Sequence, residues 1–194
     1  EPTVVAVQTK DNKVVAIGKY AEQMLGRTPA SIQALRPIQS GVIADADTAR
    51  EFIRLFLHEV LGKRVMFRPL VICSIPSNAT PLERSMTISV LRGAGAGRVG
   101  LIDEPLASVI GAGVQIHEPS GTLVVHLGAG TTEVAAVSLG GVVSQRVIRV
   151  GSDQFKQDLI DWLLKSHGIL AGLQTAEELR RFAGFPGSGD PQET

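Results

Sequence analysis

Residues 123–134 read Leu-Val-Val-His-Leu-Gly-Ala-Gly-Thr-Thr-Glu-Val and are the most informative stretch of the chain. Two apolar runs of β-forming residues flank a turn of small residues, in which backbone N–H groups can approach a bound group closely. A turn of exposed N–H groups is suited to holding an anion. The stretch therefore predicts a phosphate-binding hairpin and, through it, a nucleotide site. Taken alone, the turn is equally consistent with an ordinary glycine hairpin. The order of the surrounding elements is needed to choose between the two interpretations.

The composition excludes several classes of protein. The 194 residues carry 19 acidic and 19 basic side chains, so no overall positive field attracts nucleic acid. The single cysteine, Cys73, excludes a disulfide framework and a cysteine-based metal site. The four histidines lack metal-ligand spacing, and no metal site is expected. No signal peptide or membrane-spanning run is recognisable, which favours a cytoplasmic protein.

The N-terminal third predicts a hairpin followed by helices. β-rich runs at residues 3–8 and 14–17 enclose a turn, and a short helix is expected over residues 19–25. Residues 28–41 are punctuated by Pro, Gly and Ser and predict a loop. Asp47 is expected to cap the next helix. That helix has one apolar face, made by Phe52, Leu55, Phe56 and Val60.

After residue 69, predicted strands and helices alternate. Buried strands are expected over residues 70–75 and 99–102. Between them, Thr80-Pro81-Leu82-Glu83 predicts a helix start, with Thr at the N-cap, Pro at N1 and Glu closing a capping box. A second helix is expected over residues 105–113. Such alternation is typical of α/β proteins, whose ligands bind in a crevice at the strand ends.

A third strand and two helices are expected after the phosphate-type hairpin. The strand covers residues 142–150. Ser152 or Asp153 is expected to cap the next helix, and Thr175-Ala176-Glu177-Glu178 predicts a second capping box. Residues 184–194 are rich in Gly and Pro and predict a loop or a disordered tail. The helix after residue 152 is expected to bury Phe155, Leu159, Trp162 and Leu163.

Several segments, in this order, resemble the bacterial actins of the MreB group, the rod-shape-determining proteins. The match is collinear over nearly the whole chain, and its specificity lies in the joint order and spacing of short motifs. The segments that carry it are Glu1-Pro2-Thr3-Val4-Val5-Ala6, Leu25-Gly26-Arg27-Thr28-Pro29, Arg36-Pro37-Ile38, Gly41-Val42-Ile43-Ala44-Asp45, residues 104–113, residues 128–135 and Thr175-Ala176-Glu177-Glu178.

The resemblance implies an α/β fold of the actin-like (ribonuclease H-like) kind, in which two lobes with mixed sheets enclose a cleft for ATP or ADP with magnesium. Residues 1–113 would form the remainder of the first lobe, with a small subdomain at about residues 19–65. Residues 114–194 would form the first part of the second lobe and end inside its small subdomain. The family's first strands and first phosphate loop have no counterpart, so we expect a fragment or a chain incomplete at both ends.

The resemblance also assigns roles to individual residues. The family's second phosphate loop falls on Gly128, Ala129, Gly130 and Thr131. Its adenosine-contacting stretch falls on Glu177, Glu178, Leu179 and Arg180. Its catalytic glutamate, which orients the water that attacks the γ-phosphate, falls on Glu104, and phosphoryl transfer needs such an oriented water. Without the resemblance, Glu104 is better explained as an acid that complements a helix dipole.

Four features depart from the family pattern. His126 replaces an aspartate that helps to hold magnesium, and a neutral imidazole brings no negative charge to that cation. Ala129 replaces a glycine, which is tolerable only at negative φ. Ser152 replaces a glycine and Lys156 an acidic residue at the start of the next helix, and Phe182 replaces a glutamate. These changes predict an ATPase that is slow at most.

A membrane contact is a further feature that the resemblance implies. Val65, Met66 and Phe67 lie between basic residues, and in relatives a hydrophobic loop at this position enters the membrane. Apolar burial and attraction to anionic lipid would together anchor a filament of many subunits. From the sequence alone, the start of a buried strand explains these three residues slightly better.

The function implied is that of an MreB-like bacterial actin. It would bind ATP and polymerise with copies of itself into filaments. These would lie on the inner face of the cytoplasmic membrane and organise cell shape with the cell-wall synthesis machinery. The alternative is a degenerate actin-like regulator that keeps the fold without hydrolysing ATP. A sugar kinase or chaperone-type ATPase is a third hypothesis, but no segment supplies a recognisable sugar-binding acid and base.

Overall fold

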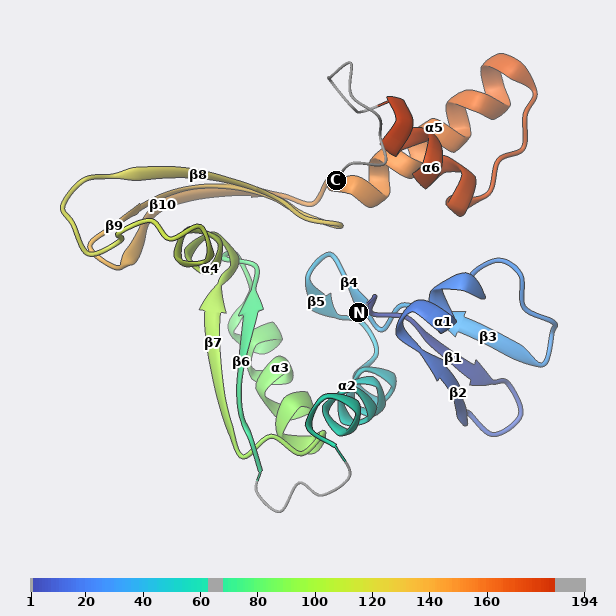
Figure 1. Ribbon diagram of the computed structural model, residues 1–194, viewed down its shortest axis with the longest axis horizontal. Helices are drawn as coiled ribbons and strands as arrows, with labels where there is room; N and C mark the ends of the chain where they lie inside the picture. Colours follow the sequence, from blue (N-terminus) through green and yellow to red (C-terminus); the bar gives the residue numbers. More distant parts are fainter. Residues whose placement is uncertain (1, 63–67, 184–194) are drawn as a thin grey trace.

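The computed structural model describes residues 2–62 and 68–183. The predicted membrane contact, Val65, Met66 and Phe67, lies outside these residues. Within them, no helix is both long enough and apolar enough to cross a bilayer. The N-terminal sheet and the last two helices lie opposite each other (Figure 1).

The N-terminal sheet is built on a buried central strand. β1 (Val5–Gln8) pairs antiparallel with β2 (Val14–Ile17) on one side and with β3 (Ile32–Leu35) on the other. Because side chains alternate along a strand, one face of the sheet packs on Ala21 and the other on Phe52. The predicted hairpin is confirmed, and both of its faces are covered.

Two helices provide those covering side chains. α1 (Gly18–Gln23) carries Ala21, and α2 (Ala46–Leu61) carries Phe52. The cap of α2 is Asp45, whose Oδ1 accepts from the backbone N–H of Asp47 at 3.1 Å. The prediction that Asp47 is the cap is therefore wrong, because the extended backbone of an N-cap belongs to Asp45.

Residues 28–41, predicted as a loop, contain strands instead. Besides β3, they include β4 (Ile38–Gln39), which pairs with β5 (Val42–Ile43) across a two-residue turn. Ser40 and Gly41 in this turn have φ values of 49° and 74°, the geometry that matches the twist of paired strands. The prediction was wrong because such short strands carry too little hydrophobic pattern.

A parallel strand pair and two helices follow. β6 (Leu70–Ile75) pairs with β7 (Arg98–Asp103), and α3 (Pro81–Gly93) connects them. The predicted capping box is confirmed, since the Glu83 carboxylate accepts from the Thr80 N–H at 2.7 Å while the Thr80 hydroxyl accepts from the Glu83 N–H at 3.2 Å. α4 (Glu104–Gly111) begins directly after β7, which places Glu104 at the carboxyl end of that strand.

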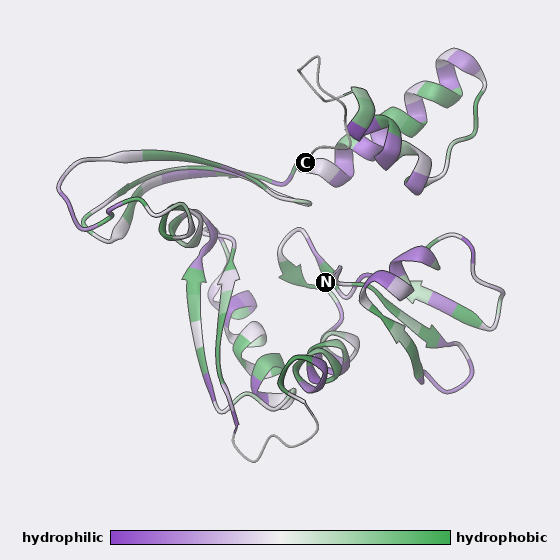
Figure 2. Cartoon of the chain, in the orientation of Figure 1, coloured by the Kyte–Doolittle hydropathy of each residue, from purple (hydrophilic) through white to green (hydrophobic). Residues whose placement is uncertain are grey.

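Residues 122–148 form an antiparallel meander. β8 (Thr122–Leu127), β9 (Thr132–Ser138) and β10 (Gly141–Ile148) lie in this order, so the predicted hairpin is confirmed. Ala135 and Val137 are buried on the face of β9 that meets α4. The odd-numbered residues of β8 are exposed and are Leu123, Val125 and Leu127. Hydrophobic residues lie along the strands of the meander (Figure 2).

The last two helices differ from the prediction in three ways. α5 (Ser152–His167) has Gly151 at its N-cap without a side-chain cap, so neither Ser152 nor Asp153 is the cap. Phe155 and Trp162, expected to be buried, are 51% and 53% exposed, because no described element covers that face. α6 (Leu173–Ala183) begins before Thr175, which therefore lies inside the helix and does not start a capping box.

Candidate functional site

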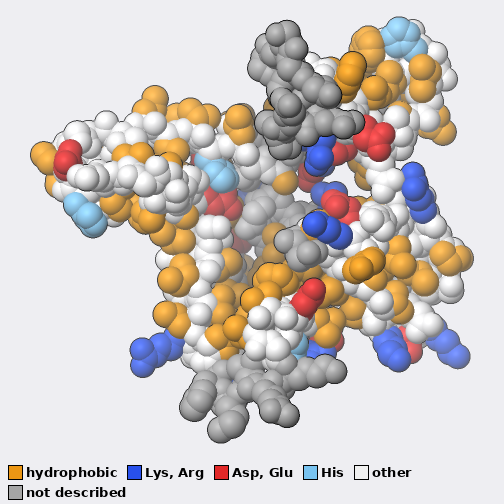
Figure 3. All heavy atoms as spheres, in the orientation of Figure 1, with side chains coloured by type: hydrophobic (Ala, Val, Ile, Leu, Met, Phe, Trp, Pro, Cys, Tyr) orange, Lys and Arg blue, Asp and Glu red, His pale blue; other side chains and the backbone are white. Residues whose placement is uncertain are grey.

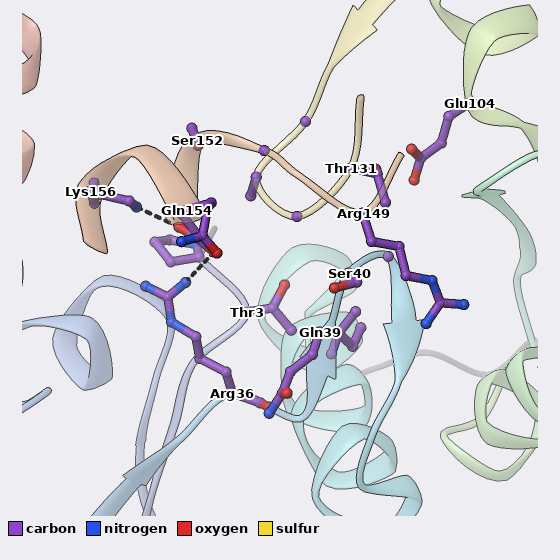
Figure 4. Close-up of a pocket in the computed structure, with 18 of the residues that line it drawn as sticks. Thr3, Arg36, Gln39, Ser40, Glu104, Thr131, Arg149, Ser152, Gln154 and Lys156 are labelled. Atoms are coloured by element: carbon purple, nitrogen blue, oxygen red, sulfur yellow. Dashed lines mark hydrogen bonds and ion pairs between the residues drawn. The ribbon is translucent and has the colours of Figure 1, made fainter. Parts of the chain in front are cut away.

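A cleft of about 690 Å³ separates the N-terminal half of the chain from its second half. Arg36 and the β4–β5 turn line one side, while the turn at residues 128–131 and the start of α5 line the other. Glu104 and Lys156 lie at opposite ends of this hollow (Figure 4). Acidic and basic side chains gather where the α5–α6 pair approaches the N-terminal sheet (Figure 3). Segments far apart in sequence therefore meet around one cleft.

The turn at residues 128–131 lines the cleft and has free backbone N–H groups. The carbonyls of Gly128 and Ala129 accept from the N–H groups of Ser152 and Asp153, at 3.1 and 2.9 Å. In a trans peptide unit, a carbonyl and the following N–H point in opposite directions, so the N–H groups of Ala129 and Gly130 point away from α5. Neither has an acceptor among the described residues. The turn therefore has two backbone N–H groups that are free to donate, those of Ala129 and Gly130.

Two glycines are required where backbones approach closely. A Cβ on Gly130 would lie 2.6 Å from the Ser40 Cα, and a Cβ on Gly151 would lie 2.6 Å from the Ala129 carbonyl carbon. Only glycine lets the turn, the β4–β5 tip and α5 meet at these separations. Ala129 is not among the non-glycine residues with positive φ, so its methyl group meets the condition expected from the sequence.

Glu104 is a largely buried carboxyl that lines the cleft. Its side chain is 16% exposed. Burial raises the pKa of Glu104 to about 7, and the charge of Glu133 and a hydrogen bond with that carboxyl add to the increase. Burial therefore favours the protonated form of Glu104 well above the pH at which a free glutamate ionises. Its carboxylate form can orient a water molecule and accept a proton, whereas its acid form can only donate one.

Glu133 is a buried carboxyl beside Glu104 that the sequence analysis did not single out. It is fully buried on β9, and its Oε2 accepts from the Ser77 hydroxyl and from the Ser77 N–H. Its Oε1 is buried and has no hydrogen-bond partner among the described residues. The sequence contained a signal for its burial, because Glu133 shares one face of a β-strand with the apolar residues Ala135 and Val137.

His126 contacts Glu104 from the neighbouring strand. Its Nδ1 lies 2.9 Å from the Ser108 hydroxyl oxygen, and its Nε2 lies 3.6 Å from Oε2 of Glu104. The Ser108 hydroxyl also lies 2.8 Å from the Glu104 carbonyl oxygen, to which it can donate. The Ser108 contact holds the imidazole ring with Nε2 facing the Glu104 carboxyl.

A line of charged side chains runs across the cleft to α6. Arg36 donates to Asp153 at 2.9 Å, and Lys156 lies 2.5 Å from the same carboxylate (Figure 4). Lys156 also lies 3.9 Å from Glu177. Hydrogen bonds from Arg180, and then from Arg181, lower the pKa of Glu177 to about 2. The carboxylates at this end of the cleft are therefore already paired with cations.

The structure brings only part of the predicted site together. Glu104 and residues 128–131 all line the cleft. Residues 177–180 lie on α6, and they are not among the residues that line it. Glu177 is connected to the cleft through Lys156, whereas Glu178 and Leu179 are exposed. The predicted phosphate and nucleoside contacts are thus separated by a basic side chain.

The described residues fit the phosphates of a nucleotide. Free N–H donors in the turn, together with Arg149 and Lys156, present positive groups to the cleft. Within residues 2–62 and 68–183, no group of three or more His, Cys, Asp or Glu side chains is placed to hold a metal ion. His126 offers nitrogen where a hard cation prefers oxygen. No step of the chemistry is therefore assigned to magnesium.

Comparison with protein families and curated proteins gives one consistent result. The family model described as MreB/Mbl protein matches residues 1–193. The chain is 40% identical over 195 residues to the cell shape-determining protein MreB of Escherichia coli (strain K12), and 34% identical over 180 residues to the cell shape-determining protein Mbl of Bacillus subtilis (strain 168). These matches cover 98% and 93% of this chain but 56% and 54% of the relatives. The chain thus spans about half of their length.

Solved structures show the same likeness. MreB5 of Spiroplasma citri bound to ADP matches with a TM-score of 0.87 and 32% identity, over 94% of this chain and 54% of that one. Its structure bound to AMPPNP matches with a TM-score of 0.85 and 33% identity, over 94% and 55%. The MamK double helical filament matches with a TM-score of 0.74 at 18% identity, over 98% and 59%, which shows the fold alone. The predicted actin-like α/β fold is confirmed, and the chain covers part of it.

Proposed function

Because this chain belongs to the MreB/Mbl family of cell shape-determining proteins, we propose that it binds an adenine nucleotide in its cleft and assembles with copies of itself into filaments. One observation carries the nucleotide: the turn at residues 128–131 presents the free N–H groups of Ala129 and Gly130 in a cleft of about 690 Å³. MreB5 of Spiroplasma citri binds ADP and AMPPNP, which supports the same class of ligand here.

The proposal gives each predicted site residue a role. Residues 128–131 hold phosphate oxygens through their N–H groups. Glu104, in its carboxylate form, orients the water that attacks the terminal phosphate. Residues 177–180 contact the nucleoside from α6, which requires Lys156 to move aside from Glu177. We place the division between the two lobes at residues 113 and 114, with a small subdomain at about residues 19–65.

A matched pair of glycine substitutions tests the nucleotide site. Gly130→Ala puts a Cβ against Ser40, whereas a Cβ at Gly121 meets nothing within 4 Å. In calorimetric titrations of the full-length protein, we expect Gly130→Ala to weaken ADP binding by about tenfold or more, because even a small displacement of the turn moves both donors. Gly121→Ala should bind as the unmodified protein does. Equal affinity of the two variants, or no affinity of the unmodified protein for ATP or ADP, would contradict the proposal.

Self-assembly is supported by the family and by the filament that MamK forms on the same fold. Electron microscopy of the full-length protein, with and without ATP, tests it. We expect filaments whose number or length depends on the nucleotide. A protein that stays monomeric under both conditions would contradict this part of the proposal.

Membrane contact at the inner face of the cytoplasmic membrane, alongside the cell-wall synthesis machinery, is proposed from sequence. Val65, Met66 and Phe67 combine apolar area with flanking basic residues, which together give weak attachment that many subunits in a filament multiply. When Met66 and Phe67 are both changed to Ser, less protein should sediment with anionic liposomes than for the unmodified protein. Equal pelleting of this variant and the unmodified protein would remove the membrane claim.

One observation favours a second candidate function, a regulator that keeps the fold without turning over ATP. His126 lines the cleft where the family has an aspartate, and an imidazole supplies nitrogen where a magnesium ion prefers oxygen. Phosphate release measured on the full-length protein separates the candidates. Turnover that Glu104→Ala abolishes supports the cytoskeletal ATPase, whereas nucleotide binding without turnover supports the regulator.

A further inference from the structure

An ion pair joins the N-terminal sheet to the helix that begins beside the turn at residues 128–131. Arg36 directly follows β3, and Asp153 lies in the first turn of α5. Nη1 of Arg36 donates to Oδ2 of Asp153 at 2.9 Å, although the two residues are 117 positions apart in the chain. Both residues line the cleft, and their side chains are 34% and 39% exposed (Figure 4). The pair therefore connects the two sides of the cleft.

The backbone on each side holds its member of the pair in place. Next to Arg36, the side chain of Pro37 is fully buried, and the Pro37 carbonyl accepts two backbone hydrogen bonds, at 2.9 and 3.2 Å. On the other side, the N–H of Asp153 donates to the Ala129 carbonyl at 2.9 Å. The ion pair thus joins two backbones that are each fixed by hydrogen bonds of their own.

Asp153 is connected directly to one of the two free donors of the turn. The Ala129 carbonyl, which accepts from Asp153, and the Gly130 N–H belong to the same planar peptide unit. A small rotation of this unit changes the direction of the Gly130 N–H. The position of Asp153 therefore affects where this donor points.

Lys156 also contacts Asp153, but it cannot connect the two sides of the cleft. Its Nζ lies 2.5 Å from Oδ1 of Asp153, and both residues belong to α5. Arg36 reaches the other carboxylate oxygen from the opposite side. Loss of Arg36 would therefore leave Asp153 with a cationic partner and avoid the cost of an unpaired carboxylate. What would be lost is the connection across the cleft.

We propose that Arg36 is a positioning residue for the nucleotide phosphates, because it holds Asp153, and through Asp153 the peptide unit between Ala129 and Gly130, against the N-terminal side of the cleft. The inference rests on the proposed function, since it concerns the turn assigned to hold phosphate oxygens. In this role Arg36 acts on the protein and not on the ligand. Without it, the turn and the start of α5 are free to move away from the N-terminal sheet, and nucleotide affinity falls.

A double-mutant cycle with Arg36→Gln and Asp153→Asn tests this role in calorimetric titrations of the full-length protein with ADP. We expect each single variant to weaken ADP binding by about threefold, because a partly exposed ion pair contributes modestly. The double variant should bind no more weakly than the weaker single variant, since both changes break the same contact. Arg54→Gln, which breaks a similar pair with Glu51 on α2 outside the cleft, should bind as the unmodified protein does.

The amide signal of Gly130 in the nuclear magnetic resonance spectrum of the nucleotide-free, full-length protein gives a second measurement. Arg36→Gln should shift this signal in the same direction as Asp153→Asn, whereas Arg54→Gln should leave it unchanged. If Asp153→Asn fails to fold, the response of the Gly130 signal to Arg36→Gln still decides.

Two results would overturn the inference. The first is a pair of single-variant effects on ADP affinity that multiply in the double variant, since Arg36 would then act independently of Asp153. The second is a Gly130 signal that does not respond to Arg36→Gln. Because that signal is recorded without nucleotide, a failure of this inference is distinguishable from a failure of nucleotide binding.

Discussion

Replacing Glu104 by Gln should make the protein more stable at neutral and alkaline pH. Glu104 lies at the end of β7 with 16% of its side chain exposed, against the buried carboxyl of Glu133. Gln keeps the size of the side chain and retains an N–H donor for Glu133, but it cannot ionise. The change therefore removes the cost of a buried charge while leaving the packing almost the same.

The pKa of Glu104 sets the size and the sign of this effect. Burial raises that pKa from 4.5 to about 7, and at about 1.36 kcal/mol for each pKa unit the shift corresponds to about 3 kcal/mol. Because the folded pKa lies above the unfolded one, the stabilising contribution of the proton is complete below pH 4.5 and is lost as the pH rises through about 7. Glu104→Gln should match the unmodified protein near pH 4 and exceed its free energy of unfolding by about 3 kcal/mol at pH 8.

Urea unfolding of the full-length protein at several pH values between 4 and 8 measures this difference. Glu118→Gln, at an exposed carboxylate, serves as the matched control and should follow the unmodified protein throughout. The reasoning would be refuted if the stability curves of Glu104→Gln and the unmodified protein ran parallel over this range. A variant that is less stable at pH 8 would refute it as well.

Three further changes give expected outcomes of known sign. Thr80→Ala removes the capping box of α3 and should cost about 1 kcal/mol of unfolding free energy, whereas Ser85→Ala on the exposed side of that helix should cost almost nothing in the same denaturation assay. Ile75→Ala removes most of a side chain that is 1% exposed and should lower the free energy of unfolding by about 2–5 kcal/mol. A smaller loss would show that neighbouring residues fill the cavity. Glu177→Gln should destabilise the protein at pH 7, and the difference should vanish as the pH falls from 4.5 to about 2, because hydrogen bonds from Arg180 hold the pKa of Glu177 at about 2. A difference that persists at pH 2 in thermal unfolding would contradict that reasoning.

The sequence predicted those features whose causes lie within a few neighbouring residues. The capping box at Thr80 and the hairpin around residues 128–131 are local, because each needs only contiguous residues of the right type. The strands within residues 28–41 are different. β3 forms because Ile32 pairs with Gln8, far away in the chain, and a four-residue segment gives no sign of that partner.

Burial and long-range polar contacts limited the prediction of the site. The apolar periodicity of α5 suggested a buried face, but it could not show that Phe155 and Trp162 meet no described partner. The alternation of residues along β9 indicates that Glu133 is buried, but it does not reveal the hydrogen-bond partner Ser77, which lies 56 residues earlier. The cluster of Glu104, His126 and Glu133 therefore emerges only when the sheet and α4 are assembled.

Hydrogen exchange resolved to single amides, measured on the full-length protein with and without saturating ADP, tests the central claim most directly. The account predicts slower exchange at the N–H groups of Ala129 and Gly130 when ADP is bound, because phosphate oxygens then accept from donors that are otherwise free. ADP binding that leaves both exchange rates unchanged would contradict it.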